Sequence, residues 1–179
     1  MRRRAAVAAL TLAVLTACNV APVDTPDPAA VPSGPLEAHG AGATGPIVEV
    51  GSGTNLGVGW RYAIYPSEDA WCTQLETVGV ATAGCGDILP QGERAFGSVA
   101  REGPHAGGVT SVDGVTVSET ATVWLITESG QRSPATLMPL EEAGLDGQAF
   151  IGFVPPDITI THVMSIALNG EILETYELP

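Results

Sequence analysis

The stretch ITITHVMSIALNGEILETYEL, residues 158–178, has the pattern of a β-hairpin. Within residues 158–168 every second side chain is apolar except for one histidine, which is typical of a strand with one buried face. Asn169-Gly170 is the dipeptide that favours a two-residue type I′ turn, and residues 171–178 then return antiparallel. We therefore predict a long hairpin here and a domain built of β-sheet.

The predicted turn also predicts which residues of the two strands lie opposite each other, because a two-residue loop fixes the register. The expected pairs are Ile166 with Leu173, Met164 with Thr175, His162 with Glu177, and Val163 with Tyr176. In this register Glu177 is the expected hydrogen-bond partner of His162.

The rest of residues 47–179 has the same β character. Residues 58–65 alternate in the manner of a half-buried strand, and the run TATVWLIT at 120–127 is apolar on both sides, which predicts a central strand covered on two faces. Asp113-Gly114 separates two short strand-like runs and predicts another hairpin turn. We expect an all-β domain, an antiparallel β-sandwich of the immunoglobulin-like or Greek-key class with roughly seven to nine short strands.

The first eighteen residues, MRRRAAVAALTLAVLTAC, have the organisation of an export signal. Residues 2–4 are arginines, and residues 5–15 form an apolar segment that is too short to cross a bilayer. The tetrapeptide LTAC that ends at Cys18 resembles the lipobox of bacterial lipoproteins. This resemblance implies cleavage before Cys18, a diacylglycerol on its sulfur, and an extracytoplasmic protein that is held to the membrane by acyl chains.

Three regions follow from these patterns. Residues 1–17 are the expected lipoprotein signal peptide, and residues 47–179 are the expected β-sandwich domain. Between them, residues 18–46 begin with the lipidated cysteine and consist mainly of Pro, Gly, Ala and a few acids, without aromatic residues or periodicity. A segment of this composition buries too little apolar surface to offset the entropy of ordering, so we expect a disordered tether.

The charge of the chain excludes one class of partner. The chain has no lysine, and the loss of residues 1–17 leaves four arginines against 20 acidic residues, a net charge of −16. Such a surface repels phosphate, so nucleic-acid binding is not expected. No stretch matches a calcium-binding loop, and the acidity is explained by solubility and by repulsion from the membrane surface.

The cysteines predict a disulfide. With Cys18 assigned to lipid, Cys72 and Cys85 remain as a pair in an oxidising compartment. A zinc site is the competing interpretation, but zinc-binding cysteines usually occur in close pairs such as C-x-x-C. We therefore expect a bridge between Cys72 and Cys85, and no bound metal.

Four aromatic residues are the candidates for binding, namely Trp60, Tyr62, Tyr65 and Trp71. Their rings could form a platform for a sugar or a peptide. The alternative is that Trp60 and Tyr62 fill the core, which needs them because the chain has only nine aromatic residues, and that Tyr65 and Trp71 are the exposed members.

No motif predicts catalysis. The chain lacks a G-x-S-x-G elbow, and its only histidines within the expected domain are His105 and His162. The glycine-rich residues 51–57 precede an expected strand rather than a helix, so they do not match a dinucleotide-binding turn, and no cofactor is expected.

The sequence therefore favours a lipid-anchored, non-enzymatic module that binds a protein or a glycan of the cell envelope. A cell-envelope hydrolase is the alternative. It would require His105 or His162 to lie within hydrogen-bonding distance of both an acid and a nucleophile in one pocket.

Lipidation at Cys18 is directly testable. The chain expressed in a bacterial host should incorporate a fatty-acid analogue, and the variant Cys18→Ala should lose that label because the thioether has no sulfur on which to form. The measurement is metabolic labelling followed by gel fluorescence. Equal labelling of both proteins would contradict the prediction.

Overall fold

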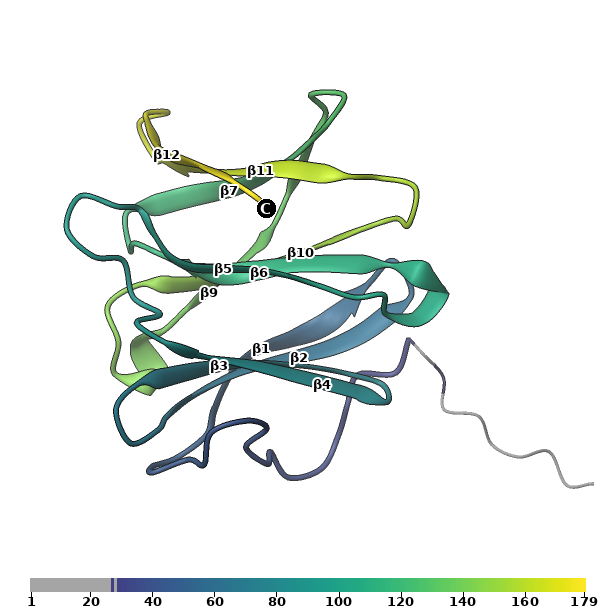
Figure 1. Cartoon of the computed structure of the whole chain (residues 1–179), viewed down its shortest axis with the longest axis vertical. Helices are drawn as coiled ribbons and strands as arrows, with labels where there is room; N and C mark the ends of the chain where they lie inside the picture. The colour runs from purple at the N-terminus through teal and green to yellow at the C-terminus, as the bar shows by residue number, and fades with distance from the viewer. Residues whose placement is uncertain (1–26, 28) are drawn as a thin grey trace, which may run out of the picture.

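The chain forms three stacked β-sheets. The structure, a computed structural model, describes residue 27 and residues 29–179. Twelve strands are arranged in three antiparallel sheets of four strands each, which lie on one another as three layers (Figure 1). The predicted all-β, antiparallel sandwich class is confirmed, whereas the chain has more strands and one more layer than the seven to nine strands of a simple sandwich.

The first sheet is continuous in sequence. Its strands are hydrogen-bonded in the order in which the chain makes them: β1 (Val48–Asn55), β2 (Val58–Pro66), β3 (Trp71–Thr77) and β4 (Val80–Gly86).

The chain passes three times between the other two sheets. The middle sheet has the order β5 (Phe96–Glu102), β6 (Thr110–Thr116), β10 (Gln148–Val154) and β9 (Thr136–Pro139). The third sheet has the order β12 (Ile172–Glu177), β11 (Ile160–Ala167), β7 (Thr120–Thr127) and β8 (Arg132–Pro134). Two single turns of 3-10 helix, at Ala106–Gly108 and Glu141–Ala143, lie between strands. Among the described residues, none of the helices has the length and apolarity that crossing a bilayer requires.

Two hydrophobic cores separate the three layers. The core between the first and middle sheets includes Trp60, Tyr62 and Ile151. The core between the middle and third sheets includes Phe96, Phe150 and Val163. The middle sheet is therefore buried on both faces.

The doubly covered strands are β6 and β10, and not the expected run at 120–127. In β7 the burial alternates, because only one face of the third sheet packs on the core. Residues 110–116 form the single strand β6, so the hairpin turn predicted at Asp113-Gly114 is wrong. A Cβ at Gly114 would lie 2.1 Å from the carbonyl oxygen of Ser98, so the glycine serves close packing of β5 on β6 rather than a turn.

The closing hairpin has the predicted register over its outer part. His162 lies opposite Glu177, Val163 opposite Tyr176, and Met164 opposite Thr175. The turn differs, because Ala167 N–H donates to Glu171 O at 2.9 Å around a three-residue loop. Only Gly170 has a positive φ in this loop, 86°, and the register shifts so that Ile166 faces Ile172 rather than Leu173.

A second irregularity separates side chains of β11 that the sequence pattern assigns to a single face of the strand. The pairing of β11 with β7 shifts between Ile160 and His162. As a result Ile160 and Val163 both lie in the second core, and His162 and Met164 lie on the opposite face of the sheet.

The predicted bridge between Cys72 and Cys85 is confirmed. The two residues face each other directly across β3 and β4, within the first sheet. Cys18 lies outside the described residues.

Residues 29–46, here called the N-terminal strap, lie across the outer face of the first sheet (Figure 1). They form neither strand nor helix, yet Arg61 Nη1 donates to Gly34 O at 2.9 Å, and His39 N–H donates to Gln74 Oε1 at 2.8 Å. Thr44 N–H donates to Pro66 O at 2.9 Å. The sequence predicts a free tether up to residue 46, whereas here part of that segment covers the sheet.

The close packing of β5 on β6 is testable at Gly114. Gly114→Ala places a methyl group against the Ser98 carbonyl and the Phe150 ring, so we expect a loss of unfolding free energy of at least about 2 kcal/mol. The control is Gly86→Ala in β4, where nothing lies within 4 Å of the added Cβ. Urea unfolding measures both, and equal stabilities of the two variants would contradict the packing.

Candidate functional site

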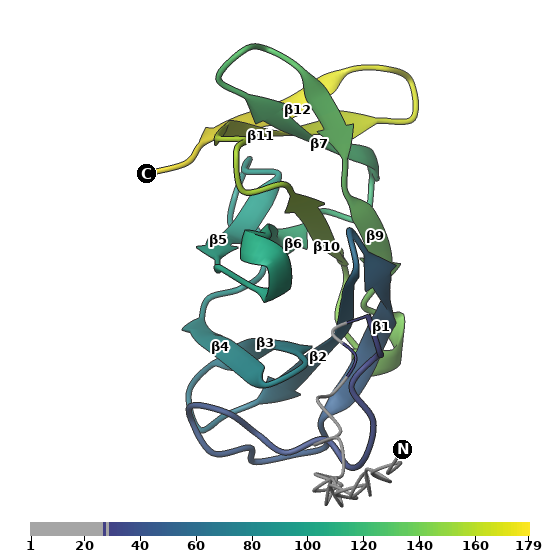
Figure 2. The same ribbon diagram turned by 90° about the vertical axis from the view of Figure 1, so that its right-hand side faces the viewer.

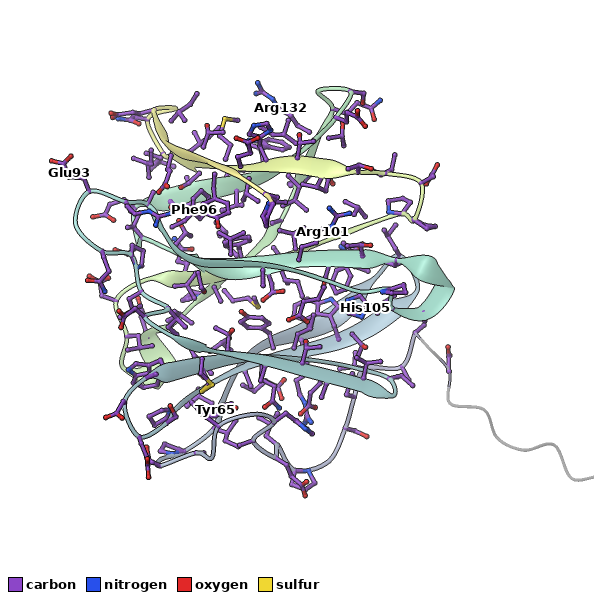
Figure 3. All side chains as sticks on the ribbon, viewed as in Figure 1. Tyr65, Glu93, Phe96, Arg101, His105 and Arg132 are labelled. Atoms are coloured by element: carbon purple, nitrogen blue, oxygen red, sulfur yellow. A yellow bond between two sulfur atoms is a disulfide. The ribbon has the colours of Figure 1, made fainter. Side chains whose placement is uncertain are left out.

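The four aromatic candidates do not form one exposed platform. Trp60 and Tyr62 are buried in the first core, as the alternative interpretation expects. Tyr65 is buried beneath the N-terminal strap, and its hydroxyl donates to His39 O at 2.6 Å (Figure 3). Trp71 is half-buried beside a shallow pocket that includes Glu68. The prediction that Tyr65 is exposed is wrong. The sequence pattern of β2 gives no indication that the strap covers this face of the strand.

The two histidines of the domain do not meet the requirement for a hydrolase. His105 Nε2 lies 2.8 Å from Ser111 Oγ, but Ser111 is fully buried in β6. His105 Nδ1 has no hydrogen-bond partner in the described part of the chain, so no acid orients the ring. Desolvation by burial lowers the pKa of His105, and the ring packs edge-on against Phe153. This pair is a core contact.

His162 hydrogen-bonds locally. Its Nδ1 lies 2.9 Å from Thr161 Oγ1, and His162 is opposite Glu177 in the strand register. Within residues 29–179 no group of three or more His, Cys, Asp or Glu side chains has a metal-binding arrangement.

The outer face of the third sheet carries an apolar centre, which is the first candidate for binding. Outward positions follow from the register, since Leu125, Val163 and Tyr176 lie side by side and pack inward. The next row of side chains therefore points outward. It comprises Thr175, Met164, Trp124 and Pro134.

The neighbouring outward row adds charge at its ends. It comprises Glu177, His162, Ile126 and Arg132. Arg132 projects away from the body of the domain in Figure 3. Beyond these rows Leu168 and Ile172 are 92 % and 58 % exposed. We call this face, made by the outward residues of β7, β8, β11 and β12 together with Leu168 and Ile172, the distal face.

The distal face and the N-terminal strap lie at opposite ends of the molecule. Figure 2 shows the strap below the first sheet and the third sheet at the other end of the stack. The described chain therefore begins at one end and presents Leu168 and Ile172 at the other.

A second candidate is a buried carboxyl group that faces a cavity. Asp113, on β6, is 3 % exposed and accepts a hydrogen bond from Tyr62 Oη to its Oδ2 at 3.0 Å. Its other oxygen, Oδ1, has no partner among the described residues. The cavity in front of it has a volume of about 150 Å³ and lies between β4 and β5.

Burial governs the charge of this group. Desolvation, with a further contribution from the negative charge of Glu102, raises the pKa of Asp113 from 3.8 to about 8, although the Tyr62 hydrogen bond acts in the opposite direction. Desolvation and the nearby Asp113 also raise the pKa of Tyr62. The Asp113 carboxyl is thus mostly protonated at neutral pH.

Sequence reasoning missed both candidates for identifiable reasons. Asp113-Gly114 is a common turn dipeptide, so the sequence predicts a turn where the structure has a buried strand. The apolar flanks in Val112-Asp113-Gly114-Val115 are the one local sign of an acid in a core. The sequence pattern does not predict the distal face, because it places Ile160, His162 and Met164 on one face of a strand. The shift in the pairing of β11 puts His162 and Met164 on the face opposite Ile160.

The pH dependence of stability tests the state of Asp113. A folded-state pKa above the unfolded one means that the native protein binds more protons, so stability falls as pH rises from about 4 to about 8. Asp113→Asn keeps an acceptor for Tyr62 and removes the titration. Its stability relative to the wild type should therefore rise with pH by up to about 1.4 kcal/mol per unit and level off above pH 8.

Urea unfolding of both proteins, at intervals of about one pH unit from about pH 5 to about pH 9, measures this difference. Asp87→Asn, which removes an exposed acid at the cavity rim, is the matched control. A stability difference between Asp113→Asn and the wild type that is independent of pH would show that the carboxyl is ionised throughout.

Comparison of the chain with family models, with curated proteins and with solved structures found no match.

Proposed function

We propose that the protein is a lipid-anchored, extracytoplasmic binding module that contacts another protein of the cell envelope through its distal face. The observation that carries the proposal is the exposed aliphatic surface at the end of the domain farthest from the N-terminal strap.

The strap supports an orientation relative to the membrane. If Cys18 carries the acyl chains, the eleven residue steps to Ala29 allow a separation of at most about 40 Å. The strap is held on the first sheet by hydrogen bonds to Arg61, Gln74 and Pro66, so the first sheet is tied to the anchored end of the chain. The distal face is then free to point away from the lipid surface.

The chemistry of the distal face favours a protein partner over a glycan. Sugar rings stack on aromatic rings, and Trp124 is the one aromatic side chain in the two outward rows. The surrounding apolar surface is aliphatic, with Ile126 and Ile166 half-buried and Leu168 almost fully exposed. Partly exposed apolar side chains within a charged rim, here Arg132 and Glu177, are typical of a protein interface.

The hydrolase alternative has less support. His105 approaches the hydroxyl of Ser111, but that serine has no access to solvent. The second histidine of the domain, His162, is half-buried and contacts a threonine of its own strand.

Site-specific photocrosslinking tests the proposed interface. A photoreactive amino acid at Leu168 in the full-length lipidated chain should form a crosslink to one defined envelope protein in cells. The matched control is Val80, an apolar residue of β4 that is also exposed but lies on the first sheet. Equal crosslinking from both positions, or none from Leu168, would contradict the proposal.

Substitution of the same face provides a second measurement. Ile172→Glu should lower the crosslink yield from Leu168 by more than about tenfold, because a charge within an apolar interface must be desolvated. Its melting temperature should stay within about 2 °C of the wild type, since Ile172 is largely exposed. Val80→Glu is the matched control and should leave the yield unchanged.

A further inference from the structure

The cavity in front of Asp113 opens between two sheet edges. β4 is the edge strand of the first sheet and β5 is the edge strand of the middle sheet, so neither has a neighbour on this side. The cavity of about 150 Å³ is lined by both strands and by Asp113 at its inner end. Its walls are mostly small or apolar, with Cys85, Ile88, Val99 and Ala100 among them.

Two polar atoms at this cavity lack hydrogen-bond partners among the described residues. They are Asp113 Oδ1 and Ser98 Oγ. A buried polar atom without a partner costs about 1–3 kcal/mol, and native proteins seldom leave such an atom without a ligand or water. The other Asp113 oxygen, Oδ2, already accepts a hydrogen bond from Tyr62 at 3.0 Å, so Oδ1 is the oxygen that a ligand would contact.

The charges around the cavity select a cation. The titratable groups that face Asp113 are Tyr62 on β2, Glu102 on β5 and Asp87 on the rim, and none of them is basic. Arg101 is a neighbour in sequence, but it projects toward the third sheet, on the other side of β5 (Figure 3). A cationic group that enters the cavity would therefore meet only negative or neutral partners.

We propose that this cavity binds a primary ammonium group on a short alkyl chain, with the ammonium at Asp113 Oδ1 and Ser98 Oγ and the alkyl chain against Ile88 and Ala100. An apolar pocket with a few convergent polar groups is the usual form of a small-ligand site. The ammonium has three donors, and two of them can be accepted by Asp113 Oδ1 and Ser98 Oγ. A divalent metal would need more oxygen ligands than the cavity offers. This site is separate from the distal face and does not depend on the proposed function.

Binding should compete with protonation of Asp113. An alkyl ammonium group keeps its charge up to about pH 10, whereas the carboxyl with a pKa of about 8 must lose its proton to pair with it. The affinity should therefore weaken by up to about tenfold for each pH unit below 8, because each binding event then releases one proton. Tyr62 stays protonated over this range because its pKa is raised further above 10.

Isothermal titration calorimetry with n-butylammonium chloride tests the proposal on the full-length chain in a non-ionic detergent. The wild type should bind this probe at pH 8 and bind n-butanol, which has the same alkyl chain without the charge, at least about tenfold more weakly. Asp113→Asn should lower the affinity for the probe by more than about tenfold, and Ser98→Ala by a smaller factor. The variant Glu93→Gln, an exposed acid that does not line the cavity, should bind as the wild type does.

The ammonium group has two possible sources, and a second probe separates them. The capped peptide Gly-Gly-Lys-Gly-Gly represents a lysine side chain of a partner, and the same peptide with norleucine in place of lysine is its control. Binding of the peptide assigns a lysine side chain, and binding of n-butylammonium alone assigns a small amine. If neither probe binds, if n-butanol binds equally well, or if Asp113→Asn binds as the wild type does, the proposal is overturned.

Discussion

Burial of both faces of the middle sheet is the constraint on which this structure depends. The middle sheet contributes Ile151 to one core and Phe150 to the other, so each of its faces needs a second sheet to cover it. A two-layer sandwich would leave one of these residues in water, at a cost of about 2 kcal/mol for each large apolar side chain. The third layer follows from that requirement. The same requirement places Asp113 in an apolar environment that a surface strand would not provide.

The sequence predicts those features that depend on local pattern. Strand character, the outer register of His162 with Glu177 and the pairing of Cys72 with Cys85 were all accessible. The three-layer arrangement could not be predicted. Gly114 in β6 and Gly152 in β10 each remove a side chain from a strand that is buried on both faces, so neither strand has the continuous apolar run typical of such a strand. Turn dipeptides were ambiguous for a similar reason. Asn169-Gly170 does end a strand, although in a longer loop, and Asp113-Gly114 does not.

The N-terminal strap illustrates why composition alone misplaced a boundary. Its own residues bury little apolar surface, and the partners that hold it are polar groups of the sheet. Arg61 pairs with Glu76 through Nε at 3.0 Å and still has a donor for the strap, while Gln74 Nε2 donates to Glu37 O at 2.9 Å. These sheet groups would be unsatisfied under an apolar cover, so a strap rich in exposed carbonyl groups suits them. The composition of the strap gives no sign of what lies beneath it.

The order in which the chain visits the layers bears on how the protein folds. The first sheet joins only neighbours in sequence, so its contacts can form as soon as residues 48–86 are available. The middle and third sheets are interleaved, since β10 must return beside β6 and β11 beside β7 before either sheet is complete. Such non-local pairings are slow relative to local ones. We expect the first sheet to form first, and the strands that complete the distal face to assemble last, with the C-terminal hairpin.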